Sequence, residues 1–428
     1  MKTWKPALAL LATTSVLLAA CSSNEDDKAE VSSDPSELKG QTITVGSWKG
    51  TEAEVTTWDK MLKDFTKQTG IKVKKKIYND YQTQLQTDLV GGTAPDVFYV
   101  DAFLSPELSK QGVLAPLDDY MKQTKDFKKE DYYAPAYKAF TAEDGKQYGL
   151  PKDYSTLGVY YNEALLQDAG VSPDDIPTKS EDWPAFLSEL KDKLPKGVSP
   201  AITTSELARH LFVMEASGTA ITDDKGYAVL SNPAQIEQLQ PIVDAYKEGL
   251  IRRPADLGQG WAGDSFGAQK AALMIEGNWA VAHLKQNFKD VKFGTKETPT
   301  INDKNGSMMF TVSYSMNAQT KFKAASWEFI KYAAGKEGMK IWADGAGTLP
   351  SLQSVASEMK LEEDPIKAPF VKAGAYATPW QKGDTLSIIA REYNNQFPAA
   401  LKGEVSLEEA MKKAEKTANK DIKTQLNK

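Results

Sequence analysis

The sequence predicts an α/β protein with two lobes. Strand-like and helix-like segments alternate from residue 41 to residue 101, and this alternation is typical of an open sheet with helices on its faces. About 390 residues follow residue 40, which exceeds the ~250–300 residues at which one hydrophobic core stops growing. A chain of this length and pattern is therefore expected to divide its core between two α/β lobes.

The first predicted strand and helix come directly after the leader. Residues 41–45 alternate between polar and apolar side chains, and the strand breaks at Gly46, Ser47 and Trp48. A helix is expected from Ala53 to Thr69, because its apolar residues recur at steps of three and four. These residues are Val55, Trp58, Leu62 and Phe65.

The next segments continue the same alternation. Residues 71–77 form a second strand with lysines on one side, a helix follows over 81–90, and residues 96–101 form a third strand. The third strand is apolar on both faces, as a central parallel strand is. Open α/β sheets bind ligands beyond the carboxyl ends of their strands, so Ser47, Trp48 and Asp101 are candidate binding residues.

The rest of the chain is predicted in less detail. Residues 148–155 lead into an apolar strand over 157–161, where we expect the chain to pass from the first lobe to the second. A mostly helical stretch is expected to about residue 290. Strands return near 291–293 and 309–316, and a helix follows over 324–334. The region from about residue 351 is predicted to be helical.

The amino terminus has the layout of an export signal. Two lysines precede an uncharged apolar run from Ala7 to Ala20, and the only cysteine of the chain, Cys21, follows Leu18-Ala19-Ala20. Such a layout indicates a signal peptide over 1–20, and the last four residues resemble a bacterial lipobox, in which the thiol receives a diacylglyceryl group. The alternative is an ordinary signal peptide with a cysteine near its cleavage site.

Lipidation would place the protein on the extracytoplasmic face of a bacterial cell membrane. Residues 21–40 are polar and are expected to form a flexible tether, and no later segment reaches the ~20 apolar residues of a membrane span. The formal charge is −6, and it becomes about −8 once Lys2 and Lys5 leave with the signal peptide. An acidic chain of this kind argues against nucleic acid as a partner.

Residues that could carry catalysis are scarce. His210 and His283, the two histidines, lack the spacing of a metal site, and each is expected on the surface or packed in a helix. A nucleophile elbow and a nucleotide-binding glycine loop are both missing, so we expect no cofactor and no metal. A glycosidase that uses two carboxylates remains an alternative, because acidic residues are abundant.

The tryptophans divide into two groups. Trp58 and Trp327 lie on apolar helical stripes and are predicted to be in the core, as is Trp342, and Trp183 is expected to anchor the first turn of a helix. The second group lies beside loop-forming residues and has no helical stripe to join. Its members are Trp48, Trp261, Trp279 and Trp380.

Carbohydrate offers a reason for a tryptophan in a loop. The C–H patch on one face of a pyranose packs on an indole ring, and its hydroxyl groups need polar partners nearby. The loop tryptophans are therefore candidate sugar contacts, with Trp279 the strongest. The alternative is that they seal the junction between the lobes.

Four stretches in this order resemble family 1 extracellular solute-binding proteins, the group that includes maltose-binding protein and serves ABC sugar importers. The strongest is 266–279, with the sequence FGAQKAALMIEGNW. The others are GTAPDV at 92–97, YGLP at 148–151 and GTLPS at 347–351. The resemblance covers essentially all of the chain after the tether.

The resemblance implies two lobes joined by crossing hinge segments, with the ligand in the cleft between them. Lobe one would hold 41–150 and 298–348, and lobe two 151–297 and 349–428. Family ligand contacts map onto Ser47, Trp48, Asp101, Asp153, Tyr154, Asn278 and Trp279, and less clearly onto Trp380, Asp384 and Arg391. Trp261 depends on its loop position alone, because its surroundings depart from the family pattern.

The predicted function is that of a monomeric, lipid-anchored receptor, and not of an enzyme. It would capture an oligosaccharide and deliver it to the permease subunits of an ABC importer. Three alternatives remain open: a secreted glycosidase, a purely structural or adhesive surface protein, and the same fold with a polyol, sugar phosphate or glycan fragment as ligand. Asp101 and Asp153 argue against a strongly anionic ligand.

Overall fold

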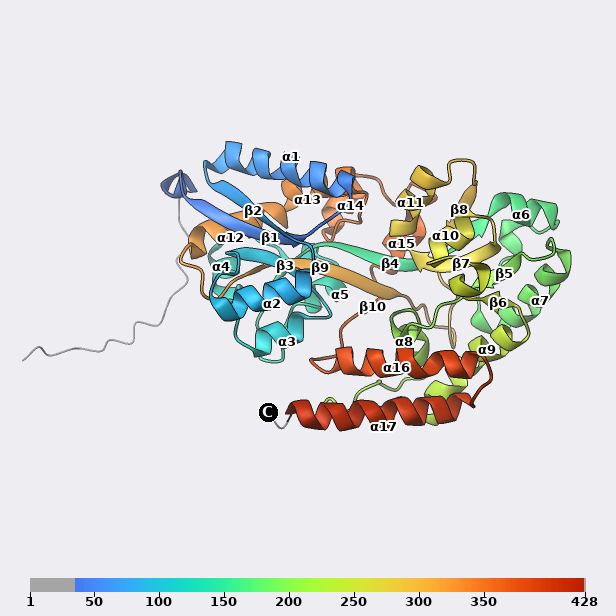
Figure 1. Ribbon diagram of the computed structural model, residues 1–428. Coiled ribbons are helices and arrows are strands. Elements are labelled where there is room, and N and C mark those ends of the chain that lie inside the picture. Colours follow the sequence, from blue (N-terminus) through green and yellow to red (C-terminus); the bar gives the residue numbers. More distant parts are fainter. Residues whose placement is uncertain (1–34, 427–428) are drawn as a thin grey trace, which may run out of the picture.

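Two long strands connect two groups of shorter strands in the computed structural model (Figure 1). The structure describes residues 35–426, and the predicted signal peptide and lipidated Cys21 lie outside this range. Strands β4 (Leu150–Asn162) and β9 (Met308–Met316) pair antiparallel with each other in the middle of a sheet with the order β2-β1-β3-β9-β4-β7-β5-β6. The strands on either side define two lobes.

The first lobe contains the predicted opening strands and helices. β1 (Thr42–Trp48) pairs in parallel with β2 (Lys72–Tyr78) and β3 (Val97–Asp101). Between them lie α1 (Glu52–Thr69) and α2 (Tyr81–Gly91). These bounds confirm the five predicted elements, but the expected break after residue 45 is wrong. Gly46, Ser47 and Trp48 continue β1, because they pair with Lys76, Ile77 and Tyr78 of β2.

Sequence signals for the ends of α1 are present in the structure. Thr51 and Glu54 form a reciprocal capping box at its start, which satisfies two backbone N–H groups there. Gly70 ends the helix with φ 75°, a left-handed conformation that a residue with a Cβ rarely adopts. The buried Trp58 of α1 and the buried Trp327 and Trp342 lie in the first-lobe core, as predicted.

The other helices around the first lobe are short or come from later in the chain. Trp327 lies on α12 and Trp342 on α13, which packs along α1. The bounds are α3 (Ser105–Lys110), α4 (Asp118–Gln123), α5 (Ala134–Lys138), α12 (Lys323–Ala333) and α13 (Lys336–Ala346). Short 3₁₀ helices over Pro35–Leu38, Lys129–Asp131, Pro173–Asp175, Ser180–Asp182 and Pro254–Leu257 complete the connections.

The second lobe has its own strands, and here the sequence prediction is partly wrong. β7 (Ala271–Gly277) pairs antiparallel with β4 and parallel with β5 (Ser199–Ile202), which pairs with β6 (Ile251–Arg252). These three strands interrupt the stretch that was expected to be mostly helical. β8 (Phe293–Lys296) and β9 confirm the two strands that were predicted after it.

Helices cover the second-lobe strands. The bounds are α6 (Glu163–Asp168), α7 (Trp183–Lys193), α8 (Leu207–Glu215), α9 (Pro233–Lys247), α10 (Ala262–Gly267) and α11 (Trp279–Asn287). Trp183 begins α7, where its indole N–H donates to the carbonyl of Pro177 at 3.0 Å. This contact confirms its predicted role at the first turn.

The carboxyl-terminal region is helical, as expected, except for one short strand. It contains α14 (Gln353–Glu358), α15 (Ala368–Ala373), β10 (Thr378–Pro379), α16 (Leu386–Leu401) and α17 (Leu407–Leu426). In Figure 1 the antiparallel helices α16 and α17 lie along the lower side of the molecule. Within residues 35–426, every helix is too short or too polar to cross a membrane.

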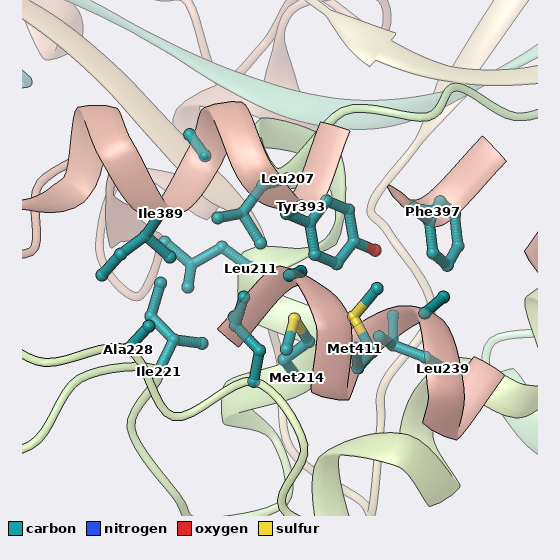
Figure 2. Packing of buried hydrophobic residues seen from close by; sticks show 14 of the residues in the cluster. Leu207, Leu211, Met214, Ile221, Ala228, Leu239, Ile389, Tyr393, Phe397 and Met411 are labelled. Atoms are coloured by element: carbon teal, nitrogen blue, oxygen red, sulfur yellow. The ribbon is translucent and has the colours of Figure 1, made fainter. Parts of the chain in front are cut away.

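The helices α8, α9, α16 and α17 share one apolar core, shown in Figure 2. Leu211 and Met214 of α8 meet Tyr393 and Phe397 of α16 in this cluster. His210 is buried beside them, with Nδ1 3.0 Å from the hydroxyl of Tyr393. Burial lowers the pKa of His210 to about 3, so the imidazole is neutral at physiological pH.

Candidate ligand-binding site

The neighbours of β9 bring distant parts of the chain together between the lobes. One side of β9 is paired with β4, and the other side is shared by β3 along 312–316 and by β10 at 308–309. The ends of β3 and β10 therefore meet near Phe310. Asp101, the last residue of β3, lies opposite Val312, and the N–H of Trp380 donates to the carbonyl of Met309 at 2.8 Å.

Four half-buried aromatic side chains gather at this point, and we call them the aromatic junction: Phe103, Trp279, Phe310 and Trp380. The rings of Phe103 and Trp380 are stacked, with centroids 5.7 Å apart and an interplanar angle of 9°. Trp279 meets Phe310 edge to face at 5.4 Å. Trp279 and Trp380 were predicted as ligand contacts, whereas Phe103 and Phe310 were not.

The Gly277-Asn278-Trp279 stretch is a turn from β7 into α11. The indole of Trp279 covers Gly277 so closely that a Cβ there would lie 2.2 Å from the ring, which explains the glycine. Asn278 is 7% exposed, and its Oδ1 accepts a hydrogen bond from the N–H of Thr156 at 3.1 Å. Asn278 therefore fixes the turn to β4.

A buried ion pair lies beside this turn. Nη2 of Arg209 donates to Oε1 of Glu276 at 2.9 Å, and the N–H of Gly277 donates to the same oxygen at 2.8 Å. Burial raises the pKa of Glu276, and the positive charge of Arg209 opposes that rise. The guanidinium also lies 5.4 Å from the ring centroids of both Trp279 and Phe310. Sequence reasoning missed Arg209 and Glu276.

Two predicted carboxylates flank β9. Asp101 on β3 and Asp153 on β4 each lie opposite Val312. Asp101 accepts a hydrogen bond from the N–H of Phe103 at 2.8 Å, and burial, together with the nearby charge of Asp153, raises its pKa to about 6. Asp153 is 7% exposed and pairs with Lys152, and its Oδ2 accepts from the indole N–H of Trp342 at 2.7 Å.

The end of β1 contributes a small hollow on the first lobe. Its volume of about 20 Å³ is lined by Ser47, Trp48, Gly50, Glu54, Val55, Trp58, Ile77, Tyr99 and Trp342, and a space of this size holds about one water molecule. The ring of Trp48 lies edge-on to Tyr99 at 5.0 Å. The ammonium group of Lys152 lies over the rings of both Tyr99 and Trp342, which line this hollow. The hollow therefore lies next to the Lys152–Asp153 ion pair.

A family model for bacterial extracellular solute-binding proteins matches residues 60–369. The chain belongs to this family. The resemblance inferred from the four sequence stretches is confirmed.

Two sequence relatives are similar along most of their length. The multiple sugar-binding protein of Streptococcus mutans is 25% identical over 378 residues, which cover 84% of this chain and 85% of the relative. The galactooligosaccharide-binding protein of Bacillus subtilis is 24% identical over 430 residues, which cover 97% of this chain and 96% of the relative.

Solved structures have the same fold at lower sequence identity. The sugar-binding protein MalE of Xanthomonas citri matches with a TM-score of 0.81 at 20% identity, covering 90% of this chain and 98% of that one. The ABC substrate-binding protein Lmo0181 of Listeria monocytogenes, solved in complex with cycloalternan, matches with a TM-score of 0.76 at 24% identity over 89% and 99%. The two-lobed α/β architecture expected for this solute-binding protein is thus confirmed.

Three predicted contacts have other partners in the structure. Tyr154 is 1% exposed and its ring lies 5.0 Å from that of Tyr133 in the core. Trp261 packs edge-on against His283 at 4.7 Å. Arg391 forms ion pairs with Glu392 of its own helix and with Asp421 of α17, and the second pair fastens α16 to α17.

Metal binding has no structural support in the part of the chain that is described. Among residues 35–426, His, Cys, Asp and Glu side chains nowhere gather in a group of three that could hold a metal ion. His283 instead pairs with Asp264 at 3.0 Å. The candidate site offers aromatic surface, hydrogen-bond acceptors and paired charges.

Proposed function

We propose that this solute-binding protein captures an oligosaccharide at the aromatic junction and delivers it to the permease of an ABC importer. The observation that carries the proposal is two aromatic contacts between separate segments of the chain, Trp380 with Phe103 and Trp279 with Phe310, near Asp101 where the lobes join. Half-buried rings offer apolar faces to a pyranose, and the carboxylate offers an acceptor for its hydroxyl groups.

The charges around the site favour an uncharged ligand. Arg209 is paired with Glu276 and Lys152 with Asp153, so these cations are already neutralised. Asp101 accepts from a backbone N–H and has no ion pair within the described structure. An anionic sugar phosphate or uronate would meet this carboxylate while both Arg209 and Lys152 are already paired.

The relatives support the same ligand class. Their names describe proteins that bind multiple sugars, galactooligosaccharides and, in a third case, maltodextrin in Bacillus subtilis. Their identities of 24–26% leave the choice of sugar open. We therefore infer an oligosaccharide without assigning its residues or linkages.

The proposal also includes how the protein is held at the membrane and how its lobes close on the ligand. A diacylglyceryl group on Cys21 would hold the protein, as a monomer, at the extracytoplasmic face of the membrane. Lobe one over 41–150 and 298–348 would close on lobe two over 151–297 and 349–428 around the ligand, and the permease would recognise the closed form. Growth of the cells with radiolabelled palmitate tests the anchor. The label should be recovered on wild-type protein and not on Cys21→Ala.

The test of binding is a thermal-shift panel of neutral oligosaccharides, followed by calorimetry with each sugar that stabilises the protein. A ligand at about 100 times its Kd adds about 2.7 kcal/mol to the free energy of unfolding. Native mass spectrometry of freshly purified protein would identify a sugar that is retained from the cell. If no neutral oligosaccharide stabilises the protein but a peptide or a metal ion does, the proposal is wrong.

Trp279→Ala is the first variant to measure. Truncation of a central tryptophan commonly costs about 2 kcal/mol or more, or roughly thirtyfold in Kd, while the lobes stay folded. Trp183→Phe is the matched control, because Trp183 is a helix-start tryptophan of the same lobe that contacts Pro177. Unchanged affinity in folded Trp279→Ala would remove this residue from the site.

Prolonged incubation with an oligosaccharide separates a binding protein from a glycosidase. If the protein only binds, the sugar should be recovered intact at one equivalent per chain. Chromatography of the sugar after incubation measures this directly. Shorter products that accumulate beyond one equivalent would show an enzyme.

A further inference from the structure

Arg209 connects three segments of the candidate site. It lies on α8, forms an ion pair with Glu276 of β7, and lies over the rings of Trp279 at the start of α11 and Phe310 on β9. Its side chain is 16% exposed.

The guanidinium is held by charge and by rings more than by hydrogen bonds. Nη2 donates to Glu276, and Nη1 lies 3.8 Å from the carboxylate of Glu206, whereas the buried Nε has no hydrogen-bond partner. A cation over an aromatic ring is attracted to the negative face of that ring. The orientation of Arg209 and the orientation of the two rings therefore depend on each other.

The contacts of Arg209 fall on both ends of one turn. Glu276 and Trp279 are three residues apart, and Gly277 and Asn278 between them form the turn from β7 into α11. The ion pair fixes the start of this turn and the cation–π contact fixes the indole at its end. Gly277 and Phe310 also touch the indole, but neither carries a charge.

We propose that Arg209 is the positioning residue for Trp279, which sets the angle of the indole and through it the affinity for sugar. The inference rests on the proposed function, because it takes Trp279 as a ligand platform. Arg209 needs no contact with the ligand for this role. Lysine could keep the charge but not the planar fork that pairs with Glu276 and lies over a ring.

The experiment separates the position of Trp279 from ligand binding. Protein labelled with 5-fluorotryptophan gives a ¹⁹F resonance for each indole, and the resonance of Trp279 is assigned as the one that Trp279→Phe removes. The spectrum is recorded without ligand for wild type, Arg209→Met and Arg209→Lys. Affinity for the oligosaccharide found in the panel is measured on the same proteins.

Arg253→Met is the matched control. Arg253 also combines an ion pair, to Asp256 at 2.8 Å, with a cation–π contact, to Tyr246 at 5.6 Å, but it lies away from the aromatic junction. We expect Arg209→Met to shift or broaden the Trp279 resonance and to weaken binding at least tenfold. Arg209→Lys should recover part of both, and Arg253→Met should change neither.

Two results would overturn the inference. One is a Trp279 resonance that stays unchanged in folded Arg209→Met. This result would overturn the inference even if wild-type protein binds no sugar and the proposed function fails. The other is a shifted resonance with wild-type affinity. If Arg209→Met does not fold because Glu276 is left unpaired, the double variant Arg209→Met/Glu276→Gln removes both charges and is judged by the same two measurements.

Discussion

Asp101 and Asp153 lie opposite the same residue of β9, yet their carboxylates have different surroundings. Asp153 has Lys152 and the indole N–H of Trp342 as partners. Asp101 has one backbone N–H, and its burial raises its pKa to about 6. Within this pair Asp101 is thus the carboxylate with acceptor capacity left for a ligand, and its charge should depend on pH in the mildly acidic range.

Burial of the charged Asp101 carboxylate should lower the stability of the folded protein, and Asp101→Asn should reveal this cost. The pKa of Asp101 rises from 3.8 to about 6 on folding, so the folded state disfavours the charged form. The penalty is absent below about pH 4 and complete above about pH 6. A rise of about two pKa units lowers the free energy of unfolding by at most ~3 kcal/mol. Partial contact of the carboxylate with solvent reduces this penalty to about 1–2 kcal/mol.

Asparagine keeps the acceptor for the N–H of Phe103 and removes the charge. Asp101→Asn should therefore be more stable than wild type at pH 7 by that amount, and equal to it near pH 4. Denaturant unfolding of both proteins from pH 4 to pH 8 measures the difference. The exposed Asp303, whose pKa Lys179 lowers, is the control, because Asp303→Asn should not stabilise at pH 7. A constant difference across the pH range would contradict the prediction.

Single residues of the site differ in how far the sequence could reveal them. Trp279 and Trp380 could be predicted as candidates, because each stands beside loop formers where a large ring has no helical stripe to join. Phe103 and Phe310 carry no such signal, since only the pairing of β9 with β3 and β10 brings their segments together. Arg209 lies on a helix some 70 residues before Trp279, and no local pattern indicates their contact.

Elements with strong periodicity were predicted well, and short buried strands were not. The apolar stripe of α1 and the alternation in β2 leave clear marks in the sequence. β5 and β6 span 4 and 2 residues, too few to show any period. β7 has the sequence AALMIEG, whose Ala, Leu and Met residues favour helices in isolation, and only its pairing with β4 and β5 makes it a strand.

The pair α16–α17 should contribute much of the stability of the second lobe. Phe397 of α16 is fully buried against its stacked neighbour Tyr393 in the cluster of Figure 2. Phe397→Ala removes a buried ring and leaves a cavity, so we expect a loss of about 3–5 kcal/mol in the free energy of unfolding. Lys412 pairs with Glu408 on the exposed side of α17. Lys412→Ala should therefore change the free energy of unfolding by less than about 0.5 kcal/mol.

Urea unfolding followed by circular dichroism measures both variants. Sugar affinity offers a second measurement, because α16 lies beside α8, which carries Arg209. A destabilised but folded Phe397→Ala should keep its affinity to within a few fold. A loss below 1 kcal/mol would show that α16 can separate from the lobe at little cost.

The two lobes touch through contacts at the end of β3 as well as through the shared strands. Phe103 stacks on Trp380, and Lys110 of α3 forms an ion pair with Asp384 at 2.5 Å. Both contacts join residues 103–110 to residues 380–384, just before α16. Lys110 is 65% exposed, so its ion pair should add little, whereas the stacked rings exclude water and should hold the lobes together.

Phe103→Ala should therefore shift the molecule toward a more open form. An aromatic pair contributes about 0.5–1.5 kcal/mol beyond burial, which changes the ratio of open to closed molecules by about two- to tenfold. Small-angle scattering should show a larger radius of gyration for unliganded Phe103→Ala than for wild type, and no change for Lys110→Ala. A saturating oligosaccharide that contacts both lobes should return Phe103→Ala to the compact value, because it stabilises the closed state by its difference in affinity. If the radius of gyration of Phe103→Ala equals that of wild type without ligand, the shared strands alone set the arrangement of the lobes.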